Sequence, residues 1–318
     1  YADVIIDISH EQLDKTFQYA VPDDMDGSVD IGTSVRVPFG KGNRIITGYV
    51  IGLTDKPSYP VDKIKSIDSV VTGKVNVAKS MIKLAAWLKR HYGCTMNQAL
   101  KTVIPVKDEV GHKQKKSVCL LVDTKKAQEL ISIYEKKALE ADGIINVKVE
   151  SYYRNPVSDK HIFNKKVVLN EEQQRAVDTI VEDYDNRAFN TYLIRGVTGS
   201  GKTEVYLDVI EHTINSGRQV IMLIPEIALT FQTVQRFYHR FGDKVSIINS
   251  RMSKGERYDQ FVRALKGEIS IMIGPRSALF TQFPNLGLIV IDEEHEGAYI
   301  SEQVPRYHAK DLAIHIAK

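Results

Sequence analysis

Residues 196–203 constrain the fold of this chain more than any other stretch. They read G-V-T-G-S-G-K-T and fit the pattern G-x-x-x-x-G-K-[ST]. An apolar run at 191–194 precedes them and a helical pattern at 204–215 follows, so the glycines lie between a predicted strand and a predicted helix. Such a loop turns backbone N–H groups inward, and the helix N-terminus adds partial positive charge. The segment therefore predicts a phosphate-binding loop, whereas a chance glycine-rich turn is the weaker alternative.

Apolar runs and amphipathic helical patterns alternate from residue 169 onward. Continuous apolar strands separated by helices indicate a parallel sheet covered on both faces. The predicted strands of this sheet are 191–194, 220–224, 245–248, 269–273 and 286–291.

Acidic residues follow the last of these strands. Asp292, Glu293 and Glu294 come directly after the apolar residues 288–291. An acid at the carboxyl end of a buried parallel strand points at the crevice where phosphates bind. We expect Asp292 to hold Mg²⁺ through water and Glu293 to polarise the attacking water, with His295 coupling to the nucleotide state. A solvated acidic loop is the alternative interpretation.

A nucleotide site with ATP and Mg²⁺ as cofactors follows from these motifs. Lys202 is predicted to bridge the β- and γ-phosphates, and the Thr203 hydroxyl to ligate Mg²⁺. A Gln amide can donate to and accept from adenine at once, which suits Gln173, although a simple helix start would also explain it. The predicted nucleotide-binding residues are Gln173, Gly196, Thr198, Gly199, Ser200, Gly201, Lys202 and Thr203. Lys202, Asp292 and Glu293 are the predicted catalytic residues, and Thr203 and Asp292 the predicted metal ligands.

Three further loops follow predicted strands, at 223–230, 249–257 and 274–277. Each carries hydroxyls, Gly or Arg, including Arg276, and such donors bind a sugar–phosphate backbone. Taken singly, each is also typical of an ordinary turn between a strand and a helix. Their order relative to the phosphate loop and the acidic cluster favours nucleic-acid contacts.

The front half of the chain has a different pattern. Short β-like runs are separated by turn-forming residues, and a helical period then begins at Asn76, a plausible N-cap, and ends at Tyr92. A small β-barrel or sheet with an appended helix fits residues 1–106. The predicted strands are 4–8, 16–21, 34–37, 45–53 and 64–71.

Residues 107–168 form a second predicted unit. A strand at 118–122, a charged helix at 125–138 and a strand at 144–149 are compatible with a winged-helix module, followed by a linker at 151–166. Together with the lobe at 169–318, these units predict an α/β multidomain chain.

Charge and composition limit the partners and the compartment. Residues 1–167 hold 26 Lys and Arg against 20 Asp and Glu, whereas residues 168–318 hold 17 against 20. A basic front half suits a polyanion, with solvated Lys surfaces as the alternative. The sequence contains no run of about 18 apolar residues, the length that a membrane-spanning helix needs, so we do not expect one. Two cysteines give neither a disulfide framework nor a metal site, so we expect a reducing cytoplasm.

The motifs resemble those of superfamily-two helicases, and their exact residue sequences resemble those of the primosomal protein N′ family of replication-restart helicases. The stretches I-P-E-I-A-L-T, S-K-G-E-R, R-S-A-L-F, N-L-G-L-I-V-I-D-E-E-H-E-G-A-Y and P-R-Y-H-A-K-D-L-A carry this resemblance. It is strong over 169–318 and looser before that. It implies a small N-terminal β-rich DNA-binding domain, a winged-helix module and a RecA-like lobe with the phosphate loop.

The resemblance also implies DNA-contacting residues. One group would capture the 3′ end of a nascent strand, with Gln18 where the family commonly has Asp. Another lies in an aromatic-rich loop that couples single-stranded DNA to hydrolysis, and base stacking on Tyr is tolerant of sequence. Without the resemblance, Phe17 and Tyr19 fit a core-facing strand, and Tyr307 and His308 fit packing between lobes. The implied residues are Phe17, Gln18, Tyr19, Gly40, Lys65, Tyr299, Arg306, Tyr307 and His308.

The activity implied is that of an ATP-dependent 3′-to-5′ DNA helicase of replication restart. Its partners would be forked and single-stranded DNA, a single-stranded DNA-binding protein and helicase-loading proteins of the primosome. A second motor lobe with an arginine finger and a zinc region are expected beyond Lys318, so we expect weak ATP binding and little hydrolysis here. A non-catalytic fork-DNA-binding module and another superfamily-two translocase are the alternative functions.

Overall fold

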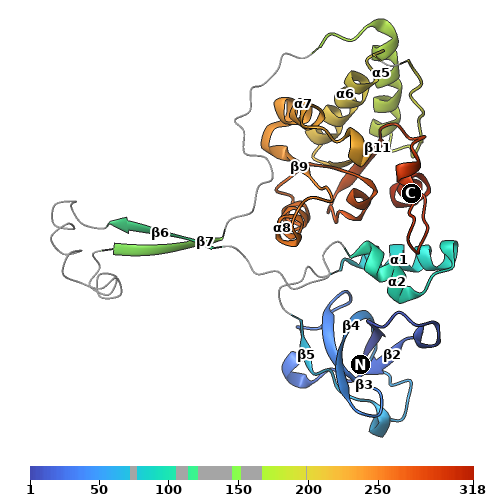
Figure 1. The fold of residues 1–318 in the computed structure, drawn as a ribbon, viewed down its shortest axis with the longest axis vertical. Coiled ribbons are helices and arrows are strands. Elements are labelled where there is room, and N and C mark those ends of the chain that lie inside the picture. The colour runs from blue at the N-terminus through green and yellow to red at the C-terminus, as the bar shows by residue number, and fades with distance from the viewer. Residues whose placement is uncertain (72–76, 105–113, 121–144, 152–166, 198) are drawn as a thin grey trace.

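The computed structural model describes residues 1–71, 77–104, 114–120, 145–151, 167–197 and 199–318. Figure 1 shows a β-sheet domain at one end, an α/β lobe at the other and a pair of helices between them. The predicted fold class, with a β-rich N-terminal part and a parallel-sheet lobe, is therefore confirmed.

The N-terminal domain is one five-stranded sheet. Its strand order is β2-β1-β4-β3-β5, and each neighbouring pair runs antiparallel. A bridge between Ala20 and Ser66 links the end of β2 to the segment before β5, so the sheet curls round its core. The strands are β1 (Ala2–Ile6), β2 (Phe17–Tyr19), β3 (Ser34–Phe39), β4 (Arg44–Leu53) and β5 (Ser69–Val70). The prediction for 64–71 was too long, since only Ser69–Val70 pairs as a strand.

The sheet meets the first helix at a glycine. Gly32 has a φ of +96°, and a Cβ there would lie 1.8 Å from the carbonyl oxygen of Val77. The two residues are joined by a hydrogen bond of 3.0 Å from the Val77 N–H to the Gly32 carbonyl. A side chain at Gly32 would therefore both strain the backbone and push the helix away from the sheet.

Helices α1 (Lys79–Tyr92) and α2 (Met96–Val103) form the pair between the two bodies. The predicted cap Asn76 lies outside the described residues, and the N-cap is Ala78, which has no side-chain cap. Instead, the Ala78 N–H donates to Oε1 of Gln282 in the lobe at 2.9 Å. The lobe thus satisfies one of the free donors that a helix start leaves.

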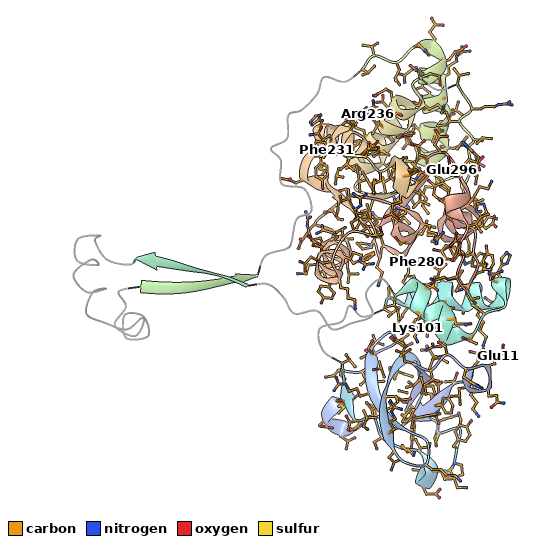
Figure 2. The ribbon with its side chains drawn as sticks, viewed as in Figure 1. Glu11, Lys101, Phe231, Arg236, Phe280 and Glu296 are labelled. Atoms are coloured by element: carbon orange, nitrogen blue, oxygen red, sulfur yellow. The ribbon has the colours of Figure 1, made fainter. Side chains whose placement is uncertain are left out.

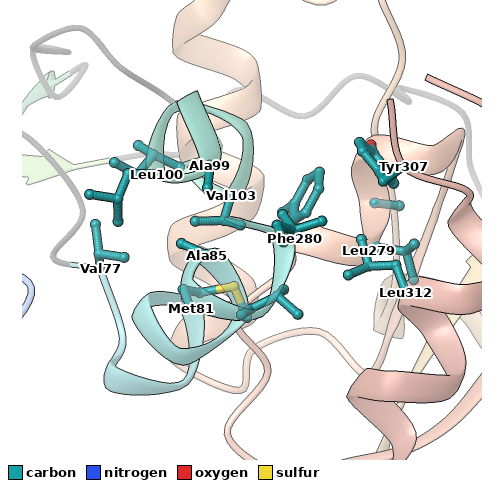
Figure 3. Packing of buried hydrophobic residues seen from close by; sticks show 14 of the residues in the cluster. Val77, Met81, Ala85, Ala99, Leu100, Val103, Leu279, Phe280, Tyr307 and Leu312 are labelled. Atoms are coloured by element: carbon teal, nitrogen blue, oxygen red, sulfur yellow. The ribbon is translucent and has the colours of Figure 1, made fainter. Parts of the chain in front are cut away.

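The helix pair and the lobe share one hydrophobic core. Figure 3 shows α1 and α2 side chains facing Leu279, Phe280, Tyr307 and Leu312 of the lobe. At one edge the Trp87 ring stacks on His315 with centroids 4.3 Å apart. Continuous apolar packing of this kind excludes water, which stabilises the contact between the two bodies.

The lobe is built on a parallel sheet with strand order β11-β8-β10-β9. Four of the five predicted strands are confirmed. The strands are β8 (Gln219–Leu223), β9 (Val245–Ile247), β10 (Ile271–Gly274) and β11 (Leu286–Ile291). The helices are α5 (Glu171–Asp185), α6 (Lys202–Asn215), α7 (Phe231–Phe241), α8 (Lys254–Leu265) and α9 (Ala309–Ala317).

The predicted strand at 191–194 was wrong, because this segment has no strand pairing in the structure. Leu193 is 73% exposed, although Ile194 packs against the apolar cluster of α5 and α6. The Tyr192 hydroxyl also donates to Asp183 of α5. In the described part of the chain no strand pairs with this segment, and Ile194 instead packs in a cluster that also contains Leu288 of β11.

Strands β6 (Gln114–Leu120) and β7 (Ile145–Ser151) pair antiparallel, with Gln114 opposite Ser151. The predicted winged-helix module can be compared only at these strands, because its helix at 125–138 falls outside the described residues. Among the helices that are described, none has the length and apolarity needed to cross a bilayer.

Candidate nucleotide and DNA sites

The phosphate loop ends where α6 begins. Gly199 and Gly201 both have a φ of +81°, and Gly201 is the N-cap of α6. A Cβ at Gly201 would lie 2.3 Å from Nε2 of Gln173, and one at Gly196 would lie 2.5 Å from Oγ of Ser200. Gly201 therefore needs glycine for both conformation and space, Gly199 for its conformation alone, and Gly196 for the room that the Ser200 side chain takes. Thr198, a predicted phosphate contact, lies outside the described residues.

The Lys202 side chain is turned onto the loop itself. Its Nζ donates to the carbonyl oxygens of Gly196 at 2.7 Å and Val197 at 3.1 Å. An ammonium group is a mobile point charge on a flexible stem, and these carbonyls are its partners here. A bound phosphate would compete with both carbonyls for the same donors.

Gln173 links helix α5 to the loop. Its backbone N–H donates to Oδ1 of Asn170, and its Oε1 accepts from the Asn170 N–H, each at 2.9 Å. Its Nε2 donates to the Ser200 carbonyl at 2.9 Å. Gln173 is therefore both a helix cap and a brace of the phosphate loop, and adenine recognition by its amide stays a prediction.

The acidic end of β11 lies against the start of α6. The Asp292 N–H continues the sheet by donating to the Leu223 carbonyl at 2.9 Å. The Tyr206 hydroxyl lies 3.4 Å from Oδ2 of Asp292 and 3.3 Å from Oγ1 of Thr203. The structure thus brings the two predicted metal ligands to one side chain that sequence analysis did not single out.

Burial sets the protonation of this cluster. It is the main cause of the raised pKa of Asp292; the neighbouring Glu293 charge adds to the rise and Lys202 opposes it. Burial, and then the Asp292 charge, raise the pKa of Tyr206 above its ordinary value. Tyr206 therefore stays neutral at physiological pH and keeps its proton for hydrogen bonding.

The oxygen ligands fit a small divalent cation. Mg²⁺ is usually held by one or two carboxylates together with substrate phosphates and water. Among the residues that the structure describes, no group of three or more His, Cys, Asp and Glu side chains could hold a metal by itself. Thr203 and Asp292 thus fit a cation that depends on phosphate oxygens for the rest of its coordination.

The remaining acids are more exposed. Glu293 has a φ of +47°, and its Oε2 lies 3.7 Å from Nδ1 of His295. Glu294 forms an ion pair with Lys310 at 3.0 Å, and the hydrogen bond from Lys310 lowers the pKa of that carboxyl. Lys310 and Glu294 thereby tie the segment after β11 to the start of α9.

Two tyrosines predicted to stack on bases lie in the core instead. Tyr299 is 1% exposed and donates to the Asp292 carbonyl at 2.6 Å. Tyr307 is 3% exposed and packs edge-on against Phe280 with centroids 5.8 Å apart. Neither ring has a face open to a base in this arrangement, which corresponds to the alternative interpretation of packing. Burial of the apolar part of each ring away from water stabilises the fold.

The other residues of this segment are placed differently. Arg306 is exposed. His308 accepts from the Lys310 N–H at 3.1 Å and so caps α9. Arg276 donates through Nη1 to the carbonyls of Ala298 at 3.0 Å and Ile300 at 2.5 Å, so it braces the loop that carries Tyr299.

The N-terminal candidate residues lie near one end of the small sheet. Phe17 packs edge-on against Phe39 at 5.1 Å, and the Tyr19 hydroxyl donates to the Pro38 carbonyl at 3.2 Å. Lys65 Nζ donates to the Gly40 carbonyl at 2.8 Å. Phe17 and Tyr19 share the core-facing side of β2, as the alternation of strand side chains requires.

Gln18 points to the other side of β2 and is 8% exposed. Its Oε1 accepts from the Ser58 N–H at 2.6 Å, and its Nε2 donates to Oδ1 of Asp3 at 3.3 Å. Its amide is therefore engaged within the protein, and it does not share one open pocket with both neighbours on β2.

Comparison with known proteins agrees with this arrangement. Residues 3–105 match the family of the PriA 3′DNA-binding domain (3′BD), and residues 166–314 match the type III restriction enzyme res subunit family. The chain is similar to the replication restart protein PriA of Bacillus subtilis, at 29% identity over 99% of this chain and 51% of the relative.

Two further relatives carry the same name. The protein of Haemophilus influenzae is 34% identical over 96% of this chain and 46% of its own length. The protein of Synechocystis is 45% identical over 44% of this chain and 17% of its own length. The chain thus spans about half the length of the relatives that match it from end to end.

Proposed function

Because this chain belongs to the replication restart PriA family, we propose that it works as part of an ATP-dependent 3′-to-5′ DNA helicase at stalled forks. In this proposal residues 1–106 bind the fork, 107–168 form a winged-helix module and linker, and 169–318 form the first motor lobe. Forked and single-stranded DNA are the nucleic-acid partners. A single-stranded DNA-binding protein and helicase-loading proteins are the protein partners, all within the cytoplasm.

The approach of Thr203 and Asp292 to one tyrosine hydroxyl is the observation that carries the nucleotide site. These residues come from the start of α6 and the end of β11, almost ninety positions apart in the chain. A loop that merely turns between two elements has no need of a half-buried carboxylate beside it. A loop that holds a triphosphate with its cation has that need.

Each residue has a role in this proposal. The loop N–H groups and Lys202 bind the phosphates, and Lys202 exchanges its two loop carbonyls for phosphate oxygens. Thr203 and Asp292 would hold Mg²⁺, which when bound neutralises the charge that develops on the phosphates. Glu293 orients the attacking water, and Tyr206 aligns the two metal ligands.

The fork site is assigned to the N-terminal sheet. Phe17 is only partly buried, with the Lys15 ammonium 5.4 Å from the centroid of its ring. Lys65 places a second cation beside Gly40. A cation next to a half-open aromatic ring suits a terminal nucleotide, whose base can stack while its phosphate is neutralised.

Two substitutions, each expected to remove one binding activity and leave the other, test the proposal. Lys202→Ala should abolish binding of a fluorescent ATP analogue and change the affinity for a fork with a 3′ hydroxyl by less than about twofold. Lys65→Ala removes the same charge and should weaken fork binding about fivefold without affecting the nucleotide, because one phosphate contact is lost. Loss of both activities in either variant would contradict two separate sites.

A second candidate function is a fork-binding module without nucleotide turnover. The observation that favours it is the Lys202 ammonium, which is satisfied by the loop carbonyls. Titration with ATP and Mg²⁺ decides between the two. A chain that binds forks but shows no nucleotide binding at millimolar concentration would be such a module.

A further inference from the structure

The turn between strands β3 and β4 stands clear of its surroundings. Its residues 40–44, here called the hairpin tip, are all exposed. A Cβ added at Gly40 or at Gly42 would meet, apart from the adjoining residues, no described atom within 4 Å. Figure 2 shows the small sheet at the opposite end of the molecule from Phe231 and Arg236 of the lobe. A ligand that reaches the hairpin tip therefore does not have to enter the lobe.

The charge of this hairpin is one-sided. Residues 31–53 contain Arg36, Lys41 and Arg44 and no Asp or Glu. Within the described part of the chain, no hydrogen bond or ion pair engages the side chain of Lys41 or Arg44. Two exposed cations without an acid beside them on the hairpin raise the local positive potential, which favours a polyanion.

The hairpin tip adjoins the candidate fork site. Arg44 pairs with Phe39 across the hairpin, and paired residues have their side chains on the same face of a sheet. The Phe39 ring packs edge-on against Phe17 with centroids 5.1 Å apart. The Lys65 ammonium donates to the Gly40 carbonyl at 2.8 Å, so it also lies at the tip. Arg44 is thus placed beside the aromatic pair of the candidate fork site.

One terminal nucleotide does not need all of these cations. Lys15 lies 5.4 Å from the centroid of the Phe17 ring and Lys65 lies at the tip, so two cations already accompany a stacked base and its phosphate. Lys41 and Arg44 add two more. At a fork the 3′ end of a strand is also the end of a duplex, so phosphates of the complementary strand lie nearby. These are the anions that remain for Lys41 and Arg44.

We propose that the hairpin tip binds the complementary strand of a duplex that ends in a 3′ hydroxyl, with Lys41 and Arg44 on its backbone phosphates. This inference rests on the proposed function and deepens it, because the sheet then recognises a paired end rather than a free strand. Phosphate contacts fix the position of a duplex and read no bases, so the preference is for pairing and not for a sequence. The terminal base stacks on Phe17 while the complementary strand lies against the hairpin tip.

The test uses two DNAs that end in the same 3′-hydroxyl strand, which is paired to a longer template in one and unpaired in the other. Arg44→Gln and Lys41→Gln each remove one cation of the hairpin tip, and Arg44→Lys keeps the charge. The matched control is Lys83→Gln, which removes an exposed cation from helix α1. Fluorescence anisotropy gives each affinity between about 50 and 300 mM salt. The melting temperature of each variant shows whether it is folded.

Arg44→Gln and Lys41→Gln should each weaken binding of the paired end about fivefold and reduce its salt slope by about 0.9, the value for one phosphate contact on a duplex. Binding of the unpaired strand should change by less than about twofold, because the complementary phosphates are missing from it. Arg44→Lys should keep the slope, and Lys83→Gln should leave both affinities unchanged. Equal losses on the two DNAs, or equal losses in Lys41→Gln and Lys83→Gln, would overturn the proposal.

Neutral phosphates locate the contact on the DNA. Methylphosphonates at the template positions opposite the 3′ end remove the charges that the hairpin tip contacts. They should weaken wild-type binding of the paired end at least as much as Arg44→Gln does, and the combined loss should be smaller than the product of the two. Methylphosphonates about ten base pairs away, one helical turn, should show no such overlap. Losses that multiply fully at the near positions would overturn the assignment to the complementary strand.

Failure of this inference and failure of the proposed function give different results. If the wild type binds ends with a 3′ hydroxyl and a 3′ phosphate equally well, the proposed fork site fails, whatever the hairpin tip does. If the wild type prefers the 3′ hydroxyl, while Lys41→Gln and Arg44→Gln bind the paired end as tightly as the wild type, only the role of the hairpin tip is overturned.

Discussion

In the N-terminal sheet the candidate side chains are held by strand pairing, whereas in the phosphate loop they are held by hydrogen bonds that a ligand would replace. Phe17 and Tyr19 sit on a strand paired to β1, and their neighbours Phe39 and Pro38 are on β3. Lys202 instead bonds to the carbonyls of its own loop. The fold thus fixes the N-terminal candidate side chains, whereas the partners of the Lys202 ammonium are ones that a bound phosphate would displace.

The difference has a structural cause. The small sheet closes its hydrogen bonds within about seventy residues of chain, through five strands and the bridge at Ala20. The segment 191–194 before the phosphate loop has no paired strand, and Leu193 is 73% exposed. Binding at a site that must rearrange costs part of the ligand's interaction energy. We therefore expect fork affinity to fall when a substitution lowers the stability of the small sheet. Nucleotide affinity should fall when a substitution removes a group that contacts the ligand.

Gly32→Ala should give the largest effect. Its Cβ would collide with the Val77 carbonyl at 1.8 Å, and its φ of +96° is strained for alanine. The free energy of unfolding of the sheet should fall by about 3 kcal/mol or more, with loss of fork binding. Gly27→Ala has a similar φ of +80° but open space around it, so it should cost only about 1 kcal/mol.

Chemical denaturation and anisotropy with a labelled fork measure the two Gly variants. Nucleotide binding should stay within about twofold in both, since the loop is formed by the lobe. A Gly32→Ala protein with an unchanged free energy of unfolding would contradict the claim that close packing at Gly32 holds the small sheet and its candidate side chains in place.

Tyr206→Phe tests the nucleotide site. It removes the hydroxyl between Thr203 and Asp292 while keeping the ring, which is 7% exposed. The Mg²⁺ concentration needed for half-maximal nucleotide binding should rise about tenfold, as for other groups that orient metal ligands. Tyr184→Phe removes a hydroxyl from the far end of the same helical layer, where it bonds Ser216, and should leave this concentration unchanged.

Gln18→Ala should have a moderate effect. The Gln18 amide joins Asp3 and the Ser58 N–H, so it fixes the loop beside β2. Losing the bond at Ser58 should cost about 1 kcal/mol and lower the affinity for a 3′-hydroxyl fork about fivefold. The affinity for a 3′-hydroxyl fork divided by the affinity for a fork blocked by a 3′ phosphate shows whether the loop takes part in end recognition. An unchanged ratio with reduced stability would assign Gln18 to the fold alone.

The smallest effect is expected from pH at the contact between the two bodies. Burial, with the charges of Arg90, His91 and Lys318, lowers the pKa of His315 below its ordinary value of 6.5. The neutral ring is thus favoured in the folded state, and its contribution is present above about pH 6.5 and lost as the pH falls through the folded pKa.

In His315→Phe the drop in melting temperature between pH 7.5 and 5.5 should be smaller by about 1 °C. His10→Phe, which replaces an exposed ring that takes no part in this contact, should show the same drop as the wild type. A larger drop in His315→Phe would show that the sign of the linkage is wrong.

The sequence predicted well where periodicity alone decides the structure. Four apolar runs became β8, β9, β10 and β11, and the glycine pattern located the start of α6 to within two residues. These elements follow from burial and backbone conformation, which the local sequence encodes. The acidic residues after β11 also lie beside α6, as the rule for carboxyl ends of parallel strands requires.

It predicted less well where long-range packing decides. An apolar run at 191–194 is equally compatible with a strand and with an unpaired segment, because pairing depends on a neighbour elsewhere in the chain. Tyr299 and Tyr307 carry no local sign that distinguishes a stacking surface from a core. Tyr206 was missed although it lies one helical turn after Thr203 and Lys202, a spacing that places it on their side of α6.

The most direct test is a double-mutant cycle on Mg²⁺-dependent nucleotide binding, measured by calorimetry with Thr203→Ala, Asp292→Asn and the double variant. If both residues hold one cation on one triphosphate, each single variant should lose most of the strengthening by Mg²⁺, and the double variant should lose no more than either. Losses that simply add, or a full Mg²⁺ effect in Asp292→Asn, would contradict a shared site.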